Sequence, residues 1–120
     1  MAKVSTDGKS TEEKMALADE ISRGYFRQGL NCAECVLRTF MDMHDIDLPD
    51  DIIKIASGFG GGMGHTKNTC GAITGAVLAL GTVKGRDPFE KEEMKDRIHQ
   101  LQGEVYPTFG SMVSEIKENY

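Results

Sequence analysis

The sequence predicts an all-α fold, a small helical bundle of five to six helices with a glycine-rich loop before the central helix. Three observations predict it. Apolar residues recur at intervals of three and four along most of the 120 residues, which is the spacing of one helix face. Several of these segments open with residues that are typical of helix N-termini. No segment alternates apolar and polar residues over the length of a convincing strand.

The first helix follows a capping box, in which Ser10 precedes Glu13 by three residues. Apolar residues recur at helical spacing from there to Gly29, where we expect the helix to end. Residues 1–9 have no such periodicity and are expected to form a disordered N-terminal segment. Because residues 10–120 contain no stretch that is typical of a linker, we expect them to form a single helical domain.

The second and third helices are marked in similar ways. Asn31 and Glu34 repeat the capping box, which predicts a helix from Cys32 to about His44. Pro49, followed by two acidic residues, predicts the start of a short third helix that ends before Gly58.

The segment from Ser57 to His65 is so rich in glycine that it predicts neither a helix nor a paired strand. Glycine loses more backbone entropy on folding than any other residue, so this run indicates unusual dihedral angles or close approach of the backbone. A fourth helix is predicted from about Thr69 to Val83. Its small residues would let another helix pack closely against it: Gly71, Ala72, Gly75, Ala76 and Ala79.

The last third of the chain predicts one or two further helices. The sequence Asp87-Pro88-Phe89-Glu90 combines a cap, a first-turn proline and an acid, and predicts a helix that continues to about Tyr106. Pro107 is expected to bend or stop that helix. Gly110-Ser111 is then expected to open a final helix.

Composition excludes several classes of function. The net charge is −5 and the pI is about 5.1, without the basic cluster that a nucleic-acid binder or a protein attracted to anionic membranes needs. The longest apolar run, Ala76–Leu80, is too short to span a bilayer, and no secretory signal opens the chain. We therefore expect a cytoplasmic protein with no membrane insertion and no nucleic-acid partner.

Three cysteines suggest redox or metal chemistry, because an odd and small number does not make a disulfide scaffold. Cys32 and Cys35 form a CxxC motif whose sulfurs share one helix face. Cys32 and Cys70 each fall at a predicted helix N-terminus, where free amides and the helix dipole favour the reactive thiolate. Cys35, one turn further in, is equally well explained as a small buried apolar residue.

The glycine-rich loop leads into the helix of Cys70 and resembles an anion cradle. Neither Gly-Lys-Ser/Thr nor a preceding strand is present, so the phosphate-loop and dinucleotide motifs are absent. Two alternatives remain open. Backbone amides could bind an anionic cofactor or cluster, or the loop could be a compact helix connection. The candidate cofactor-binding residues are Gly60, Gly61, Gly62, Gly64 and Gly71.

His65 precedes Cys70 by five residues and is a candidate metal ligand with Cys32 and Cys35. Three cysteines and one histidine are a known zinc set. Thiolates also bind iron–sulfur clusters. The alternative is that His65 is a solvated loop residue.

Three segments resemble the C_GCAxxG_C_C family, described as redox-active proteins with a CGAxxG motif and four cysteines. They are Asn-Cys-Ala-Glu-Cys-Val-Leu from Asn31, the loop of residues 56–64, and Thr-Cys-Gly-Ala-Ile-Thr-Gly-Ala from Thr69. The resemblance implies that Cys32 is the first family cysteine and that Cys70 is the cysteine of the CGAxxG motif, which Gly71, Ala72 and Gly75 complete.

The resemblance also implies departures from the family pattern. A third cysteine is expected where this chain has Ser114, and a fourth lies beyond Tyr120. Cys35 is an addition. These differences leave fewer thiolates for a metal or cluster, whereas a redox pair of Cys32 and Cys70 survives them.

Two functions follow as expectations. In the first, Cys32 and Cys70 form a reversible disulfide with Cys35 as a resolving thiol, in a thiol-dependent oxidoreductase. In the second, the chain is a non-catalytic zinc or iron–sulfur module for binding or electron transfer. A third interpretation treats the thiols as incidental to the fold. A homodimer and a redox partner protein are the expected partners.

Overall fold

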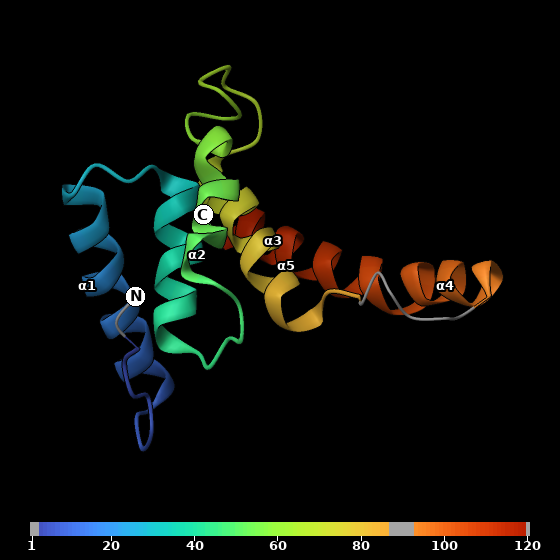
Figure 1. Cartoon of the computed structure of the whole chain (residues 1–120), viewed down its shortest axis with the longest axis horizontal. Coiled ribbons are helices and arrows are strands. Elements are labelled where there is room, and N and C mark those ends of the chain that lie inside the picture. The colour runs from blue at the N-terminus through green and yellow to red at the C-terminus, as the bar shows by residue number, and fades with distance from the viewer. Residues whose placement is uncertain (1–2, 87–92, 120) are drawn as a thin grey trace. The chain divides into compact units, whose positions relative to one another are not determined.

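The computed structural model describes residues 3–86 and 93–119. Within these ranges the chain forms five α-helices, one 3₁₀ helix and one short π-helical segment, with no strand (Figure 1). The all-α prediction is confirmed. Contacts within the chain group it into two compact units, residues 1–79 and residues 80–120. No helix among the described residues is both long and apolar enough to cross a bilayer.

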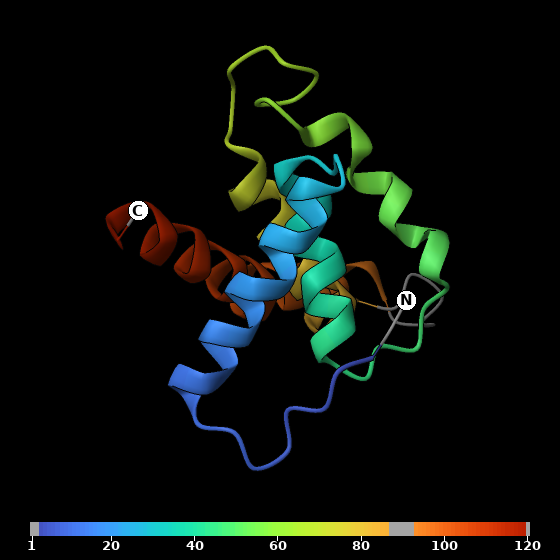
Figure 2. The same cartoon turned by 90° about the vertical axis from the view of Figure 1, so that its left-hand side faces the viewer.

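The first two helices begin at the residues that the capping boxes predict. Helix α1 spans Thr11–Arg27 and helix α2 spans Cys32–Met43. In α1 the Ser10 hydroxyl accepts a hydrogen bond from the Glu13 amide, and the Glu13 carboxylate accepts one from the Ser10 amide, both at 3.1 Å. Helices α1 and α2 lie side by side in both views (Figure 2).

The core of the first unit is centred on α2. Its buried apolar residues pack with others from the following loop, from the 3₁₀ helix and from α3: Ala33, Leu37, Met41, Ile46, Ile53, Ala56 and Ala79. Within this unit α2 contacts both α1 and the 3₁₀ helix. The sequence predicts that the helix after Cys70 is central, whereas the core of this unit is centred on α2. The small residues of the Cys70 helix allow close contact, but they bury little apolar surface themselves.

The first described residues are attached to the end of α2. The Lys3 ammonium donates to the carbonyls of Met41 at 2.7 Å and His44 at 3.1 Å, and the Val4 amide donates to the Asp42 carbonyl at 2.7 Å. A segment with no periodicity of its own thus gains hydrogen bonds by satisfying carbonyls that the end of a helix leaves without partners.

The third predicted helix is a 3₁₀ helix, η1, over Asp50–Phe59. It begins directly after Pro49, as predicted. It continues past Ser57 and Gly58, so the prediction of an irregular segment from Ser57 onward was wrong for its first three residues. Hydrogen bonds between Ser57 and the start of α2, one accepted and one donated by Ser57, hold this turn and outweigh the low helix propensity of Gly58.

Helix α3 spans Gly71–Lys84 and begins slightly later than predicted. Its buried residues recur at every fourth position: Gly71, Gly75 and Ala79. A Cβ atom on Gly75 would lie 2.8 Å from the Ala33 carbonyl oxygen and 2.9 Å from the Ala33 Cα. The prediction of close approach by small residues is therefore confirmed, with α2 as the neighbour.

The second unit contains α4 (Met94–Gln100), the π-helical segment η2 (Leu101–Val105) and α5 (Tyr106–Asn119). The predicted helix start at residues 87–90 lies outside the described residues. Pro107 does not stop the helix, because it lies inside α5. Gly110-Ser111 also lies inside α5 rather than opening it, so the prediction of a new helix start there was wrong. The π-helical hydrogen bond from the Tyr106 amide to the Leu101 carbonyl widens the helix just before Pro107. Such a bulge accommodates a proline that has no amide to donate.

Candidate functional site

The start of α2 presents Cys32 to solvent as the first helical residue, as predicted. The Asn31 side chain accepts a hydrogen bond from the Glu34 amide at 2.9 Å, and the Glu34 carboxylate accepts one from the Asn31 amide at 3.0 Å. This capping box fixes the first turn of the helix, and with it the backbone that carries the thiol.

The start of α3 presents Cys70, which is also exposed. Cys70 lies immediately before the helix rather than within its first turn. Its carbonyl accepts hydrogen bonds from the amides of Ile73 at 3.0 Å and Thr74 at 3.2 Å. Cys70 therefore occupies the position of a helix cap, next to the amides that have no partner within the helix.

The two cysteine-bearing helix starts lie against each other in the first unit (Figure 2). A Cβ atom on Gly71 would lie 3.1 Å from the Cβ of Cys32 and 3.2 Å from the Ala33 amide nitrogen. Because Gly71 has no side chain, the backbone next to Cys70 reaches the side chain of Cys32. The structure thus brings the neighbour of Cys70 into direct contact with Cys32.

Cys35 differs from the other two cysteines. Its side chain is buried, and its thiol donates a long hydrogen bond to the Leu30 carbonyl at 3.7 Å. Burial raises the pKa of the Cys35 thiol, and the negative charges of Cys32 and Glu34 raise this pKa further. Cys35 is therefore held in the neutral thiol form beside a more accessible Cys32.

A set of hydrogen bonds ties the start of α2 to the end of η1. The Asn31 side-chain amide donates to the Ser57 carbonyl at 3.0 Å, and the Ser57 hydroxyl donates to the Glu34 carboxylate at 3.3 Å. A Cβ atom on Gly60 would lie 2.7 Å from the Asn31 side-chain nitrogen. The capping-box pattern predicts the roles of Asn31 and Glu34 but not that of Ser57, because no sequence pattern indicates a contact across 26 residues.

The glycine-rich loop extends beyond the helices in Figures 1 and 2. Residues 61–65 all have positive φ, between 61° and 74°, so the loop contains a left-handed turn. Met63 and His65 belong to this turn, and Lys67 also has positive φ, at 60°. The prediction of unusual dihedral angles is confirmed. Residues other than glycine adopt them only where the surrounding structure compensates for the strain.

Hydrogen bonds within the loop use several of its amides. The amides of Gly64, His65, Lys67 and Asn68 donate to carbonyls of residues 58–62 at 2.7–3.1 Å. A Cβ atom on Gly62 would lie 2.6 Å from the Asn68 amide nitrogen. These contacts explain why a compact connection between η1 and α3 needs glycines at these positions. An anion-binding role for Gly60, Gly61, Gly62, Gly64 and Gly71 stays a prediction.

His65 lies in the left-handed turn, exposed, with its ring against Gly61. A Cβ atom on Gly61 would lie 2.4 Å from the Nδ1 of His65. Among the residues that the structure describes, no three histidine, cysteine, aspartate or glutamate side chains are grouped so that they could hold a metal ion. The predicted ligands Cys32, Cys35, Cys70 and His65 are thus not assembled as a set.

Ser114, where the resemblance implies a third cysteine, is exposed on α5 of the second unit.

A model of the family described as "Putative redox-active protein (C_GCAxxG_C_C)" matches residues 30–116. That range covers most of the chain and includes all three cysteines, the loop and both helix starts. The chain therefore belongs to this family. No curated protein and no solved structure matches it.

Proposed function

We propose that this member of the C_GCAxxG_C_C family is a thiol-dependent oxidoreductase in which Cys32 and Cys70 form a reversible disulfide. The observation that carries the proposal is the contact of Cys32 with Gly71, the residue next to Cys70. A disulfide needs Cα atoms within about 7 Å of each other. Close contact between the two helix starts, without a side chain on Gly71 between them, favours such a bond.

The accessibility of the two thiols supports the same function. Cys32 and Cys70 are both exposed, and each stands at the start of a helix longer than ten residues. The Cys32 thiolate attacks a substrate disulfide, forms a mixed disulfide and releases one substrate thiolate. The Cys70 thiolate then attacks the Cys32 sulfur, forms the internal disulfide and releases the second substrate thiolate.

Cys35 serves in this proposal as a resolving thiol. It lies one helical turn from Cys32. Burial raises its pKa, which favours the protonated thiol before the exchange. Its thiolate attacks Cys32 in the Cys32–Cys70 disulfide, which moves the disulfide to Cys32–Cys35 and frees Cys70. A motif with one exposed and one buried thiol suits this exchange.

The alternative of a zinc or iron–sulfur module has less support. In the described part of the chain, no three such ligands are grouped. A cytoplasmic homodimer is part of our proposal, because a small chain with exposed apolar side chains such as Met15, Phe26 and Ile55 is stabilised by a partner subunit.

The proposal is tested by mild oxidation with diamide, followed by peptide mapping with mass spectrometry under non-reducing conditions. We expect an intramolecular Cys32–Cys70 disulfide in the wild type and in Cys35→Ser, and none in Cys32→Ser or Cys70→Ser. Metal analysis of anaerobically purified protein accompanies it. Absence of the Cys32–Cys70 disulfide from both the wild type and Cys35→Ser would contradict the proposal, as would stoichiometric metal bound by the thiols.

A further inference from the structure

A groove of about 420 Å³ separates the last turns of α1 from the first turns of α2. It is lined by Ser22, Arg23, Phe26, Arg27, Cys35 and Val36. Cys35 is the cysteine among them, and neither Cys32 nor Cys70 lines this groove. Both walls belong to the first unit.

The walls of this groove combine an apolar surface with a cation. The Phe26 side chain is 63% exposed and supplies the aromatic surface of the groove. Arg23 is bound by Asp19 through hydrogen bonds of 2.9 and 3.0 Å. Arg27, in contrast, has no carboxylate partner among the residues that the structure describes. A guanidinium without a carboxylate beside an exposed aromatic ring is suited to a small ligand that carries a carboxylate.

The carboxylate next to Cys35 in sequence already has hydrogen-bond partners at the start of α2 and at the end of η1. Glu34 is the acid next to Cys35 in sequence, and its two carboxylate oxygens accept hydrogen bonds from the Asn31 amide and from the Ser57 hydroxyl. The positive end of the α2 dipole also lies beside the first turns of that helix.

We propose that this groove binds the electron donor of the protein, a low-molecular-weight thiol that carries carboxylates, and delivers its sulfur to Cys35. The inference rests on the proposed redox function, and it adds the class of reductant and the place where that reductant enters. In this proposal the substrate binds at the exposed thiols of Cys32 and Cys70, and the reductant binds in the groove.

The chemistry starts from the Cys32–Cys35 disulfide. The thiolate of the bound ligand attacks the Cys35 sulfur, forms a ligand–Cys35 mixed disulfide and expels the Cys32 thiolate, which takes a proton from solvent. A second ligand thiolate attacks the ligand sulfur of that mixed disulfide and releases Cys35, which is then protonated. Two ligand thiols become one ligand disulfide, and the protein gains the two electrons as two thiols.

The direction of attack agrees with the environment of Cys35. Thiol–disulfide exchange proceeds faster when the better leaving thiol is expelled. Burial raises the pKa of Cys35, so the first step, which expels Cys32 by attack at the Cys35 sulfur, is favoured over attack at Cys32, and the release of Cys35 in the second step is the slower of the two steps. Cys35 lines the groove, whereas Cys32 does not, so a ligand bound there is closer to Cys35.

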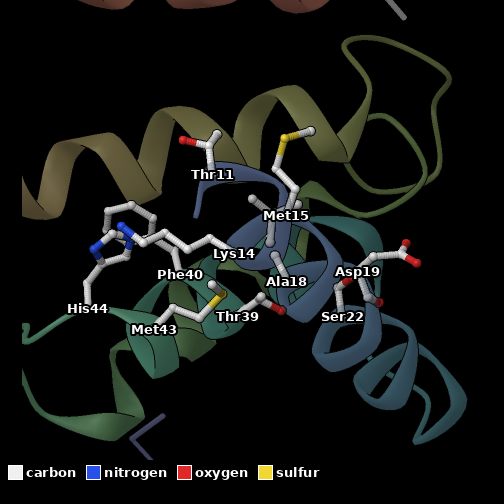
Figure 3. A pocket seen from close by; sticks show the side chains of 11 residues that line it. Thr11, Lys14, Met15, Ala18, Asp19, Ser22, Thr39, Phe40, Met43 and His44 are labelled. Carbon is white, nitrogen blue, oxygen red and sulfur yellow. Dashed lines mark hydrogen bonds between the residues drawn. The ribbon is translucent and has the colours of Figure 1, made fainter. Parts of the chain in front are cut away.

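A second groove along α1 provides the control. Figure 3 shows it between α1 and α2, with Met15, Phe40 and Met43 among its lining residues and with Lys14 and His44 at its edge. Cys35 does not line it. Replacing Lys14 removes one positive charge from α1, as replacing Arg27 does, but away from the groove of Cys35.

The experiment uses full-length Cys70→Ser protein, in which oxidation can form only the Cys32–Cys35 disulfide within one chain. Its reduction is followed by acid quenching, alkylation and mass spectrometry. The reductants are mercaptosuccinate, which carries two carboxylates, neutral 2-mercaptoethanol and cationic cysteamine, compared per thiolate. Each is measured with the Cys70→Ser protein and with added Arg27→Gln, Arg27→Lys or Lys14→Gln.

We expect mercaptosuccinate to react fastest, and Arg27→Gln to slow it about fivefold, as the loss of one exposed charge-assisted contact predicts. Arg27→Lys should recover part of the rate. The rates with 2-mercaptoethanol and the effect of Lys14→Gln should stay near those of the parent. Salt at about 0.5 M should remove most of the preference.

Equal slowing of all three thiols by Arg27→Gln, or no slowing of mercaptosuccinate, would overturn the inference. So would failure of the Cys70→Ser protein to form the Cys32–Cys35 disulfide. None of these results affects the mapping of the Cys32–Cys70 disulfide in wild type and Cys35→Ser, so failure here is distinguishable from failure of the proposed function.

Discussion

The two helix starts that carry the exposed cysteines are built in opposite ways. At α2, side chains stabilise the helix start: Asn31 and Glu34 satisfy its first amides, and Ser57 forms hydrogen bonds with both from another element. At α3, the lack of side chains on Gly71 and Gly75 positions the helix start, because it lets the α3 backbone pack directly against α2. The first start is encoded locally and the second depends on its neighbour, so the two should respond differently to substitution.

The largest contrast we expect lies within α2 itself, between Cys32 and Cys35. Iodoacetamide should alkylate Cys32 and Cys70 at least roughly tenfold faster than Cys35 near neutral pH, because Cys35 is 5% exposed and burial raises its pKa. The rate at Cys35 should keep rising at alkaline pH. Peptide-resolved mass spectrometry of reduced protein measures all three rates, and similar rates at Cys35 and Cys32 would contradict the buried position of Cys35.

The next largest effect concerns the glycine contact of α3. Gly75→Val should lower the free energy of unfolding by about 1–3 kcal/mol, since its side chain would overlap the Ala33 backbone. Gly81 is the matched control on the same helix, where a Cβ atom would meet nothing within 4 Å. Gly81→Ala should raise stability by about 0.5–1 kcal/mol. Urea denaturation compares them, and a neutral Gly75→Val would refute backbone contact between α2 and α3.

The capping residues allow a comparison of α1 with α2. Asn31→Ala should lower stability by about 1–2 kcal/mol, because it removes both the helix cap and the bond to Ser57. Ser10→Ala removes only a cap, at the start of α1, and should lower stability by about 1 kcal/mol. Alkylation of Cys32 should change in Asn31→Ala alone. An equal change in Ser10→Ala would indicate general loosening instead.

The smallest expected effect is a gain in stability in the left-handed turn. Met63→Gly should stabilise the protein by about 0.5–1 kcal/mol, because glycine adopts a φ of 66° without the strain that a side chain suffers there. Thr69→Gly is the control, at a position of the same loop without positive φ, and should destabilise. Thermal unfolding of both variants measures the difference. A destabilised Met63→Gly would mean that contacts of the methionine side chain outweigh the strain.

The difference between the two helix starts also explains what the sequence could predict. The starts of α1 and α2 were predictable to the residue, because a capping box is a pattern of neighbouring residues. The start of α3 was displaced, since glycine packing and not a side-chain cap determines it.

Other errors have the same cause. By local propensity Pro107 predicts a bend or a stop and Gly110-Ser111 predicts a new helix start, but both lie inside α5, which follows the π-helical segment directly. For the site, the sequence identified the three thiols and the loop, whereas the pairing of Cys32 with Cys70 stays a prediction. The groove beside Cys35 could not be predicted, because Arg27 and Phe26 read as ordinary residues at the end of an amphipathic helix.

The glycine contacts between α2 and α3 have a consequence for how such a protein can be tuned. Gly71 and Gly75 place no side chain between the two backbones, so the starts of α2 and α3 pack against each other directly. Backbone contact, rather than the size of any side chain, therefore limits how closely the two cysteine-bearing helix starts approach. A side chain gained at either glycine would widen the gap between them.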